Sequence, residues 1–231
     1  MMIDQTNTID KQNRILGTTT AWAVSILLVI YSLVLTLGLL SLKSPQDPIA
    51  DPYFSIMELL ILITAPLMVI TMVAVHKYAD SDAKIFSMIA LIFMVLMAGI
   101  TSCVHFVVLT VSRQIEVAGF SWASLFFSFK WPSVIYTLDI LAWDWFFALS
   151  MLFAAPVFKS SSLEKTLRIV MIISGVLSLI GLIGVPFANM NVRNIGIIGY
   201  TVVAIVVFFM IGIVFRQKER FGDYYNRLSS K

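Results

Sequence analysis

Four ionisable side chains lie inside long apolar stretches of the sequence: Glu58, His105, Asp139 and Asp144. Both aspartates belong to IYTLDILAWDWFFALS at 135–150. An ionised carboxylate inside a bilayer costs roughly 2.5–3.5 kcal/mol on insertion scales, so such acids face one another, a wet cavity or a cation. Buried acids of this kind are typical of proton relays and cation-coupled carriers. These four residues are therefore our candidate proton- or cation-binding site.

The charges of this set do not balance in the sequence. Of the 13 acidic residues, three fall in the apolar stretches, where His105 is the only basic side chain expected well inside. With all three acids ionised, even a protonated His105 leaves two negative charges uncompensated. Burial in a low dielectric and repulsion between like charges both oppose that state. We therefore expect either that one or more acids stay protonated near neutral pH or that a cation occupies the site.

Composition places these residues in a membrane. Of the 231 residues, 59% are hydrophobic and 13% are charged, whereas soluble domains carry roughly 25% charged residues. A soluble shape could not hide that much apolar surface. A bilayer needs about 20 apolar residues in each crossing helix, and six stretches qualify: 17–42, 53–75, 85–111, 132–158, 166–188 and 195–215. We predict an all-α integral membrane protein, a single domain of six transmembrane helices with tails at 1–16 and 216–231.

The segment between the third and fourth spans, 113–131, differs from the other connections. It has too few unbroken apolar residues to cross a bilayer. It is rich in aromatic side chains, which favour the headgroup level: Phe120, Trp122, Phe126, Phe127, Phe129 and Trp131. We predict an interfacial aromatic helix here, which either covers the outer mouth of the bundle or simply connects two spans.

Lys and Arg residues flank the spans unevenly, and this orients the chain. Twelve of the 16 fall on the side of the two tails, and four fall on the other side: Lys43, Arg113, Lys130 and Arg193. Because cytoplasmic flanks carry the excess of Lys and Arg, both termini are expected in the cytoplasm, with the plasma membrane as the expected location. The topology explains the basic excess, so nucleic acid is not expected as a partner.

Three of the four candidate residues are expected in one layer of the membrane. At a rise of 1.5 Å per residue, Glu58, His105 and Asp139 each lie roughly 9–10 Å below the outer ends of their helices. Asp144 lies deeper, about 18 Å in. Asp139 and Asp144 are five residues apart, which is about 140° around an α-helix. We therefore expect that these two aspartates cannot both point at one partner.

Four further residues are candidates to support the site. Tyr136 shares the side of its helix with Asp139, and Thr101 and Ser102 belong to a polar stripe with His105. Arg113 follows the outer end of the same span as His105.

The sequence leaves three functions open. The first is a small proton- or cation-coupled carrier that uses the acid and histidine cluster. The second is a structural or accessory membrane subunit, in which the same groups only form interhelical hydrogen bonds. The third, an intramembrane metal-dependent hydrolase, has two histidines, one cysteine (Cys103) and no HExxH motif to build on. The sequence also contains no GxSxG motif and no glycine-rich nucleotide loop, and we expect neither a cofactor nor a bound metal.

Six helices are few for a complete carrier, so a homodimer or a partner membrane protein is expected for that function. The fifth span offers two pairs of small residues at the spacing that permits close helix contact: Ser174 with Ser178, and Gly184 with Ala188. The lipid bilayer is the one surrounding that the sequence identifies, and the ligand is unknown.

Overall fold

The computed structural model of the protein describes residues 2–44, 47 and 49–229, and within these ranges the chain is helical without β-strands. Six helical stretches in this part of the chain are long and apolar enough to cross a membrane. They are Lys11–Leu40, Tyr53–Tyr78, Ser81–Ile115, Val134–Val157, Ser162–Gly184 and Met190–Gln217. The all-helical fold and the six apolar stretches are therefore confirmed.

Each stretch is built from one or more of the helical elements. The elements are α1 (Met2–Leu40), α2 (Tyr53–Tyr78), η1 (Ser81–Ala83), α3 (Lys84–Val107), η2 (Val108–Ser112), α4 (Arg113–Val117), α5 (Ala123–Phe127), α6 (Val134–Ile140), η3 (Leu141–Phe147), α7 (Ala148–Ala154), η4 (Ala155–Val157), α8 (Ser162–Gly184), α9 (Met190–Ile197), η5 (Ile198–Val203) and α10 (Ala204–Ser229). The elements η2, η3 and η5 are π-helical. Short π-helical insertions in α-helices occur frequently at functional sites.

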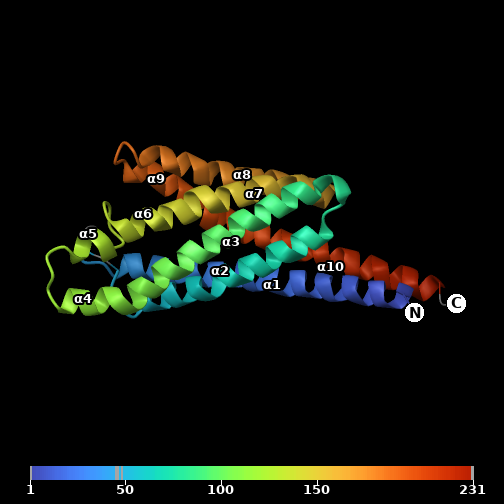
Figure 1. Ribbon diagram of the computed structural model, residues 1–231, viewed down its shortest axis with the longest axis horizontal. Coiled ribbons are helices and arrows are strands. Elements are labelled where there is room, and N and C mark those ends of the chain that lie inside the picture. The colour runs from blue at the N-terminus through green and yellow to red at the C-terminus, as the bar shows by residue number, and fades with distance from the viewer. Residues whose placement is uncertain (1, 45–46, 48, 230–231) are drawn as a thin grey trace.

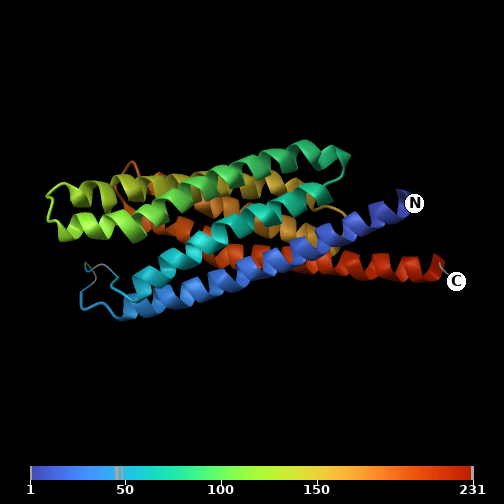
Figure 2. The same ribbon diagram turned by 60° about the horizontal axis from the view of Figure 1, so that its bottom comes forward.

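The helices lie roughly side by side in one elongated bundle (Figure 1). Both described chain ends lie at the same end of it, which we call the terminal end. The opposite end, with residues 41–44, 49–52, 118–133 and 185–189, is called the distal end (Figure 1). Along the bundle, α1 packs against α2 and α10, α2 against α3, and α8 against α9 and η5. Figure 2 shows the same order after rotation, with α1, α2 and α10 forming one side.

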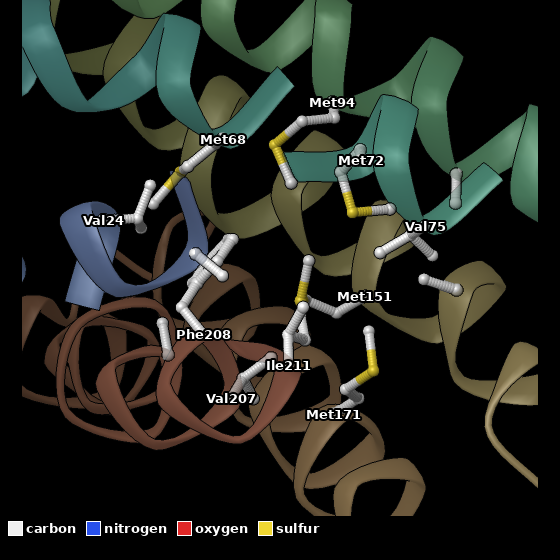
Figure 3. Packing of buried hydrophobic residues seen from close by; sticks show 14 of the residues in the cluster. Val24, Met68, Met72, Val75, Met94, Met151, Met171, Val207, Phe208 and Ile211 are labelled. Carbon is white, nitrogen blue, oxygen red and sulfur yellow. The ribbon is translucent and has the colours of Figure 1, made fainter. Parts of the chain in front are cut away.

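Methionine side chains fill the core of the terminal half. The thioethers of Met68, Met72, Met94, Met151 and Met171 converge from α2, α3, α7 and α8 upon Val207, Phe208 and Ile211 of α10 (Figure 3). Each of these five methionines is fully buried. Because methionine is unbranched and polarisable, it fills irregular gaps between helices. The methionine cluster against α10 therefore forms an apolar core in the terminal half.

Small residues bring α8 close to η5 of the same chain. The Ser174 hydroxyl donates a hydrogen bond to the Gly199 carbonyl at 2.8 Å, and a Cβ added to Gly199 would contact Ser174 and Ser178. Gly184 lies against the start of α9 in the same way. These small residues were expected to offer a dimer surface. Ser174, Ser178 and Gly184 are instead used within the chain, and Ala188 lies beyond the end of α8 at Gly184, so that support for a dimer is withdrawn.

The aromatic segment 113–131 contains two short helices instead of one. α4 continues the direction of α3, and α5 turns back over the distal end (Figure 1). Phe120 and Trp122 stack with ring centroids 5.3 Å apart, and both side chains are exposed. The Ser112 hydroxyl donates to the Phe127 carbonyl at 3.1 Å, which fixes α5 against η2.

Asp51 joins the start of α2 to α4 at the distal end. One carboxylate oxygen, Oδ1, accepts hydrogen bonds from the Ser55 hydroxyl at 2.5 Å and the Ser55 amide at 3.1 Å. The same oxygen accepts from an Arg113 guanidinium nitrogen at 3.0 Å. The Ser55 hydrogen bond first, and then Arg113, lower the pKa of Asp51 below its ordinary value.

We expect Asp51→Asn to lower the thermal unfolding midpoint of the detergent-solubilised protein at pH 7 by the equivalent of about 0.2–1 kcal/mol, because the neutral amide keeps an acceptor for Ser55 but loses the charge that pairs with the exposed Arg113 guanidinium. A carboxyl whose pKa is depressed by folding stabilises the fold above its unfolded pKa and loses that effect as pH falls. The difference between the two proteins should therefore shrink below about pH 4. Differential scanning fluorimetry at a series of pH values measures it, with the exposed-acid variant Asp82→Asn as the control. A difference that stays constant down to pH 3 would contradict this role.

Candidate functional site

Three of the predicted site residues meet in the distal half of the bundle. His105 Nδ1 of α3 lies 2.6 Å from Glu58 Oε2 of α2, which is a hydrogen-bonding distance. On the other side of the same ring, His105 Nε2 lies 3.5 Å from Asp139 Oδ1 of α6. The exposed fractions of Glu58, His105 and Asp139 are 3%, 5% and 8%. The imidazole thus lies between two carboxylates from two other helices.

Arg193 of α9 extends this set and was not predicted. One guanidinium nitrogen, Nη2, lies 3.8 Å from Asp139 Oδ2 and 3.5 Å from Asp144 Oδ2. The guanidinium carbon lies 5.0 Å from the ring centroid of Tyr136 and 5.8 Å from that of Tyr200. Arg193 is 2% exposed. We call the sequence of contacts Glu58–His105–Asp139–Arg193–Asp144 the ionisable chain.

A boundary error explains why Arg193 was missed. The sixth span was predicted to begin at 195, which placed Arg193 in the outer flank. The helix begins at Met190, because the Asn189 side chain caps it by accepting a hydrogen bond from the Val192 amide. Arg193 therefore lies inside the helix, in its first turn. The Asn189 cap is the local signal in the sequence that could have placed it correctly.

The two aspartates share Arg193, which contradicts the expectation that they could not point at one partner. That expectation assumed α-helical geometry throughout. Asp144 lies instead in the π-helical element η3. A π-helix bonds residues five apart in the chain, so it brings residues at that spacing closer to one face than an α-helix does.

Asp144 lies in a glycine-lined contact between three elements. It is fully buried, and a Cβ added to Gly181 of α8 or Gly196 of α9 would collide with its carboxylate. Both glycines are needed for the carboxylate to reach Arg193. Gly181 also leaves its helix in close contact with the backbone of α9 at Arg193.

Arg193 changes the charge balance but does not complete it. The ionisable chain holds three carboxyl groups, one guanidinium and one imidazole. With all acids ionised, one negative charge remains uncompensated if His105 is protonated, and two remain if it is neutral. The expected excess of negative charge is therefore smaller than the sequence indicated, and it persists.

A cavity of about 930 Å³ extends from the distal end down to the ionisable chain. Its floor includes Glu58, His105, Asp139 and Arg193. The wall on the α1 side is mostly aliphatic, with Leu28, Leu35 and Leu39 from α1 and Leu42 just after it, and α1 also contributes Tyr31. The other elements contribute further aromatic rings: Phe54, Phe129, Tyr136, Trp143 and Tyr200. Asp144 is not among the residues that line the cavity, so it lies behind Arg193 as seen from the distal end.

The four supporting candidates separate into two groups. Tyr136 and Arg113 line the cavity, Tyr136 beneath the Arg193 guanidinium and Arg113 near the rim with Asp51. Thr101 is buried and contacts Met97 Sδ at 3.7 Å, and Ser102 is half-buried. Neither of the last two lines the cavity in the described part of the chain.

Metal ligation has no geometric support in the described residues. No group of three or more His, Cys, Asp or Glu side chains within them is arranged to hold a metal ion.

Comparisons with protein-family models, with curated proteins and with solved structures each find no match to this chain. The function is therefore argued from the cavity and the ionisable chain alone.

We expect Arg193→Met to destabilise the protein by about 3–5 kcal/mol, because it leaves two buried carboxylates without their shared cation. Adding Asp144→Asn to that variant should recover part of the loss, since it removes one uncompensated charge. SDS titration of the solubilised proteins, analysed as a double-mutant cycle, measures both effects. Losses that simply add in the double variant would mean that Arg193 and Asp144 are not coupled.

Proposed function

We propose that the protein is an integral membrane protein that acts as a small proton- or cation-coupled carrier and uses the ionisable chain as its coupling site. The observation that carries this proposal is the position of the ionisable chain. Its side chains come from four helical stretches, carry an excess of carboxyl groups, and lie at the inner end of a ligand-sized cavity. Buried ionisable groups that line a cavity in a membrane bundle mark ion and substrate pathways.

The membrane placement is supported by the outer surface of the bundle. Large apolar side chains such as Leu33, Ile85 and Phe209 are exposed on three of the long stretches. The terminal end carries the excess of Lys and Arg side chains. Four basic residues were assigned to the distal side from the sequence, and because Arg193 is buried in the bundle, three of these four remain as flanking residues there. Positive flanks favour the cytoplasm, so we place both termini in the cytoplasm and the distal end outside. The exposed rings of Phe120 and Trp122 then lie at the outer headgroup level.

The ionisable chain supports proton exchange among Glu58, His105 and Asp139, and then a shift of Arg193 between Asp139 and Asp144. Glu58, His105 and Asp139 can each gain or lose a proton, and the distances between neighbours are 2.6 and 3.5 Å. Arg193 stays protonated in proteins, so it does not carry the proton itself. It instead pairs with whichever aspartate is ionised. Protonation of Asp139 would shift the guanidinium toward Asp144, and protonation of Asp144 would shift it back.

Passage to the terminal side requires the bundle to change shape. Asp144 is fully buried between glycines, and the methionine core lies between it and the terminal end. The π-helical elements η3 and η5 lie against each other beside Asp144 and Tyr200. A local rewinding of these elements is the movement that we expect to open the inner side.

A structural or accessory role is the second candidate, and one observation favours it. The contact between Glu58 and His105 and the two contacts of Arg193 join four helical stretches whether or not anything is transported. Interhelical polar contacts of this kind stabilise membrane bundles by about 0.6 kcal/mol each on average. This role predicts an intact fold without ion flux.

We expect Asp144→Asn to abolish proton flux, with flux normalised to the amount of folded protein because the substitution leaves Arg193 with Asp139 as its one remaining carboxylate partner among the described residues. The reason is that the amide introduced by this substitution cannot take up and release a proton beside Arg193, as the carboxyl group can. The measurement is the pH of an enclosed dye in proteoliposomes after a pH step at clamped membrane potential. Asp82→Asn, an exposed acid at the terminal end, is the matched control. Flux in the Asp144 variant equal to that of the unaltered chain would exclude the relay. Wild-type liposomes that resemble empty ones under proton, sodium and potassium gradients would favour the accessory role.

A further inference from the structure

The cavity has the size and composition of a site for an organic ligand. Its volume of about 930 Å³ lies near the upper end of the roughly 300–1,000 Å³ that is usual for ligand pockets. Bare protons or alkali cations need no such space. The α1 wall contributes aliphatic side chains, Leu28, Leu35 and Leu39 among them. A ligand that fills the cavity therefore has an apolar body.

The floor favours a positive charge on that ligand. Glu58 and Asp139 both line the cavity, and Arg193 is already placed between Asp139 and Asp144. An anion that approached Arg193 from the cavity would meet the carboxylate of Asp139 as well. A cation that approached Asp139 would meet Glu58 on the same floor, and the uncompensated negative charge of the ionisable chain attracts it.

Asp139 also has an unused acceptor on the cavity floor. Its Oδ1 atom is buried and accepts no hydrogen bond from the described residues, although His105 Nε2 lies 3.5 Å away. The residue as a whole is 8% exposed. The Asp139 side chain is 12% exposed and lines the cavity, so its carboxylate is suited to a donor or a cationic centre, because leaving a largely buried acceptor unpaired costs free energy.

The aromatic rings of the cavity already bind cations within the protein. Arg193 lies over Tyr136 and Tyr200, and Arg113 lies over Phe54 at 5.8 Å. Tyr31, Phe129 and Trp143 line the same space. Ring faces attract cations, most strongly where water is excluded, so rings and carboxylates together select for positive charge.

We infer that the cavity binds amphipathic organic cations, with the cationic centre beside Glu58 and Asp139 and the apolar body against the α1 wall. This inference rests on the proposed carrier function and names its substrate class. The bound cation then takes the place of the proton that the ionisable chain otherwise holds, so that cation and proton exchange across the membrane.

Two probes of matched shape and opposite charge test this inference. Tetraphenylphosphonium and tetraphenylborate are added separately to the purified full chain in nanodiscs, and binding is measured by equilibrium dialysis against empty nanodiscs. We expect saturable binding of tetraphenylphosphonium, at least about tenfold tighter than that of tetraphenylborate, which corresponds to about 1.4 kcal/mol. Tighter binding of tetraphenylborate would overturn the inference, as would binding of both probes no different from empty nanodiscs.

Variants locate the bound probe. Asp139→Asn should weaken tetraphenylphosphonium binding at least about tenfold, and Asp82→Asn should leave it unchanged. Leu35→Trp adds bulk to the α1 wall without changing charge, and it should also weaken binding. Each protein is first checked for an unchanged elution volume and unfolding midpoint. If Asp139→Asn misfolds, Leu35→Trp decides alone. Equal binding to the unaltered chain and to the folded variants would show partition into lipid and overturn the inference.

Proton flux separates failure of this inference from failure of the carrier proposal. Proton flux that depends on Asp144, with no binding of tetraphenylphosphonium, would refute the organic-cation site and leave the carrier standing. Specific tetraphenylphosphonium binding without any flux would keep the site and refute transport.

Discussion

A buried guanidinium shared by two buried carboxylates is the interaction on which the distal half of this bundle depends. Arg193 lies 3.8 Å from Asp139 and 3.5 Å from Asp144, with almost no exposure of the three groups. Removing one partner from a buried ion pair leaves an uncompensated charge, which is far more costly than the pair itself. The helices that carry these residues therefore cannot lose one of the three groups without leaving a buried charge unpaired.

The two halves of the bundle differ in what fills their interiors. The terminal half is filled by methionine thioethers and aromatic rings. The distal half contains the cavity and the ionisable chain, so its interior is polar at the floor and apolar along the α1 wall. A site that is open to one side and closed by a packed core on the other has the form that the carrier proposal requires of one state of an alternating-access cycle. The carrier proposal follows from this asymmetry more than from any single residue.

Close backbone approach makes the charged contact sterically feasible. Gly181 and Gly196 leave room for the carboxylate of Asp144, and Ser174 joins α8 to Gly199 of η5. The π-helical elements η3 and η5 carry Asp144 and Tyr200 into the same region. The π-helical element η3 thus carries the buried charge of Asp144, and π-helical turns are frequent at functional positions. A ligand in the cavity would contact both the charged floor and these irregular elements.

The sequence alone determined the six apolar stretches and the identity of the buried acids and histidine, because both follow from the composition of windows about 20 residues long. It also indicated that Glu58, His105 and Asp139 share one depth, since depth depends only on distance along each helix. The partner of Asp144, the burial of Arg193 and the use of Ser174 within the chain were decided by the tertiary structure. Each depends on the rotation of one helix against another and on a helix start or π turn that shifts by a few residues. A shift of a few residues leaves the mean hydropathy of a 20-residue window almost unchanged, but it changes which partner a buried charged side chain can reach.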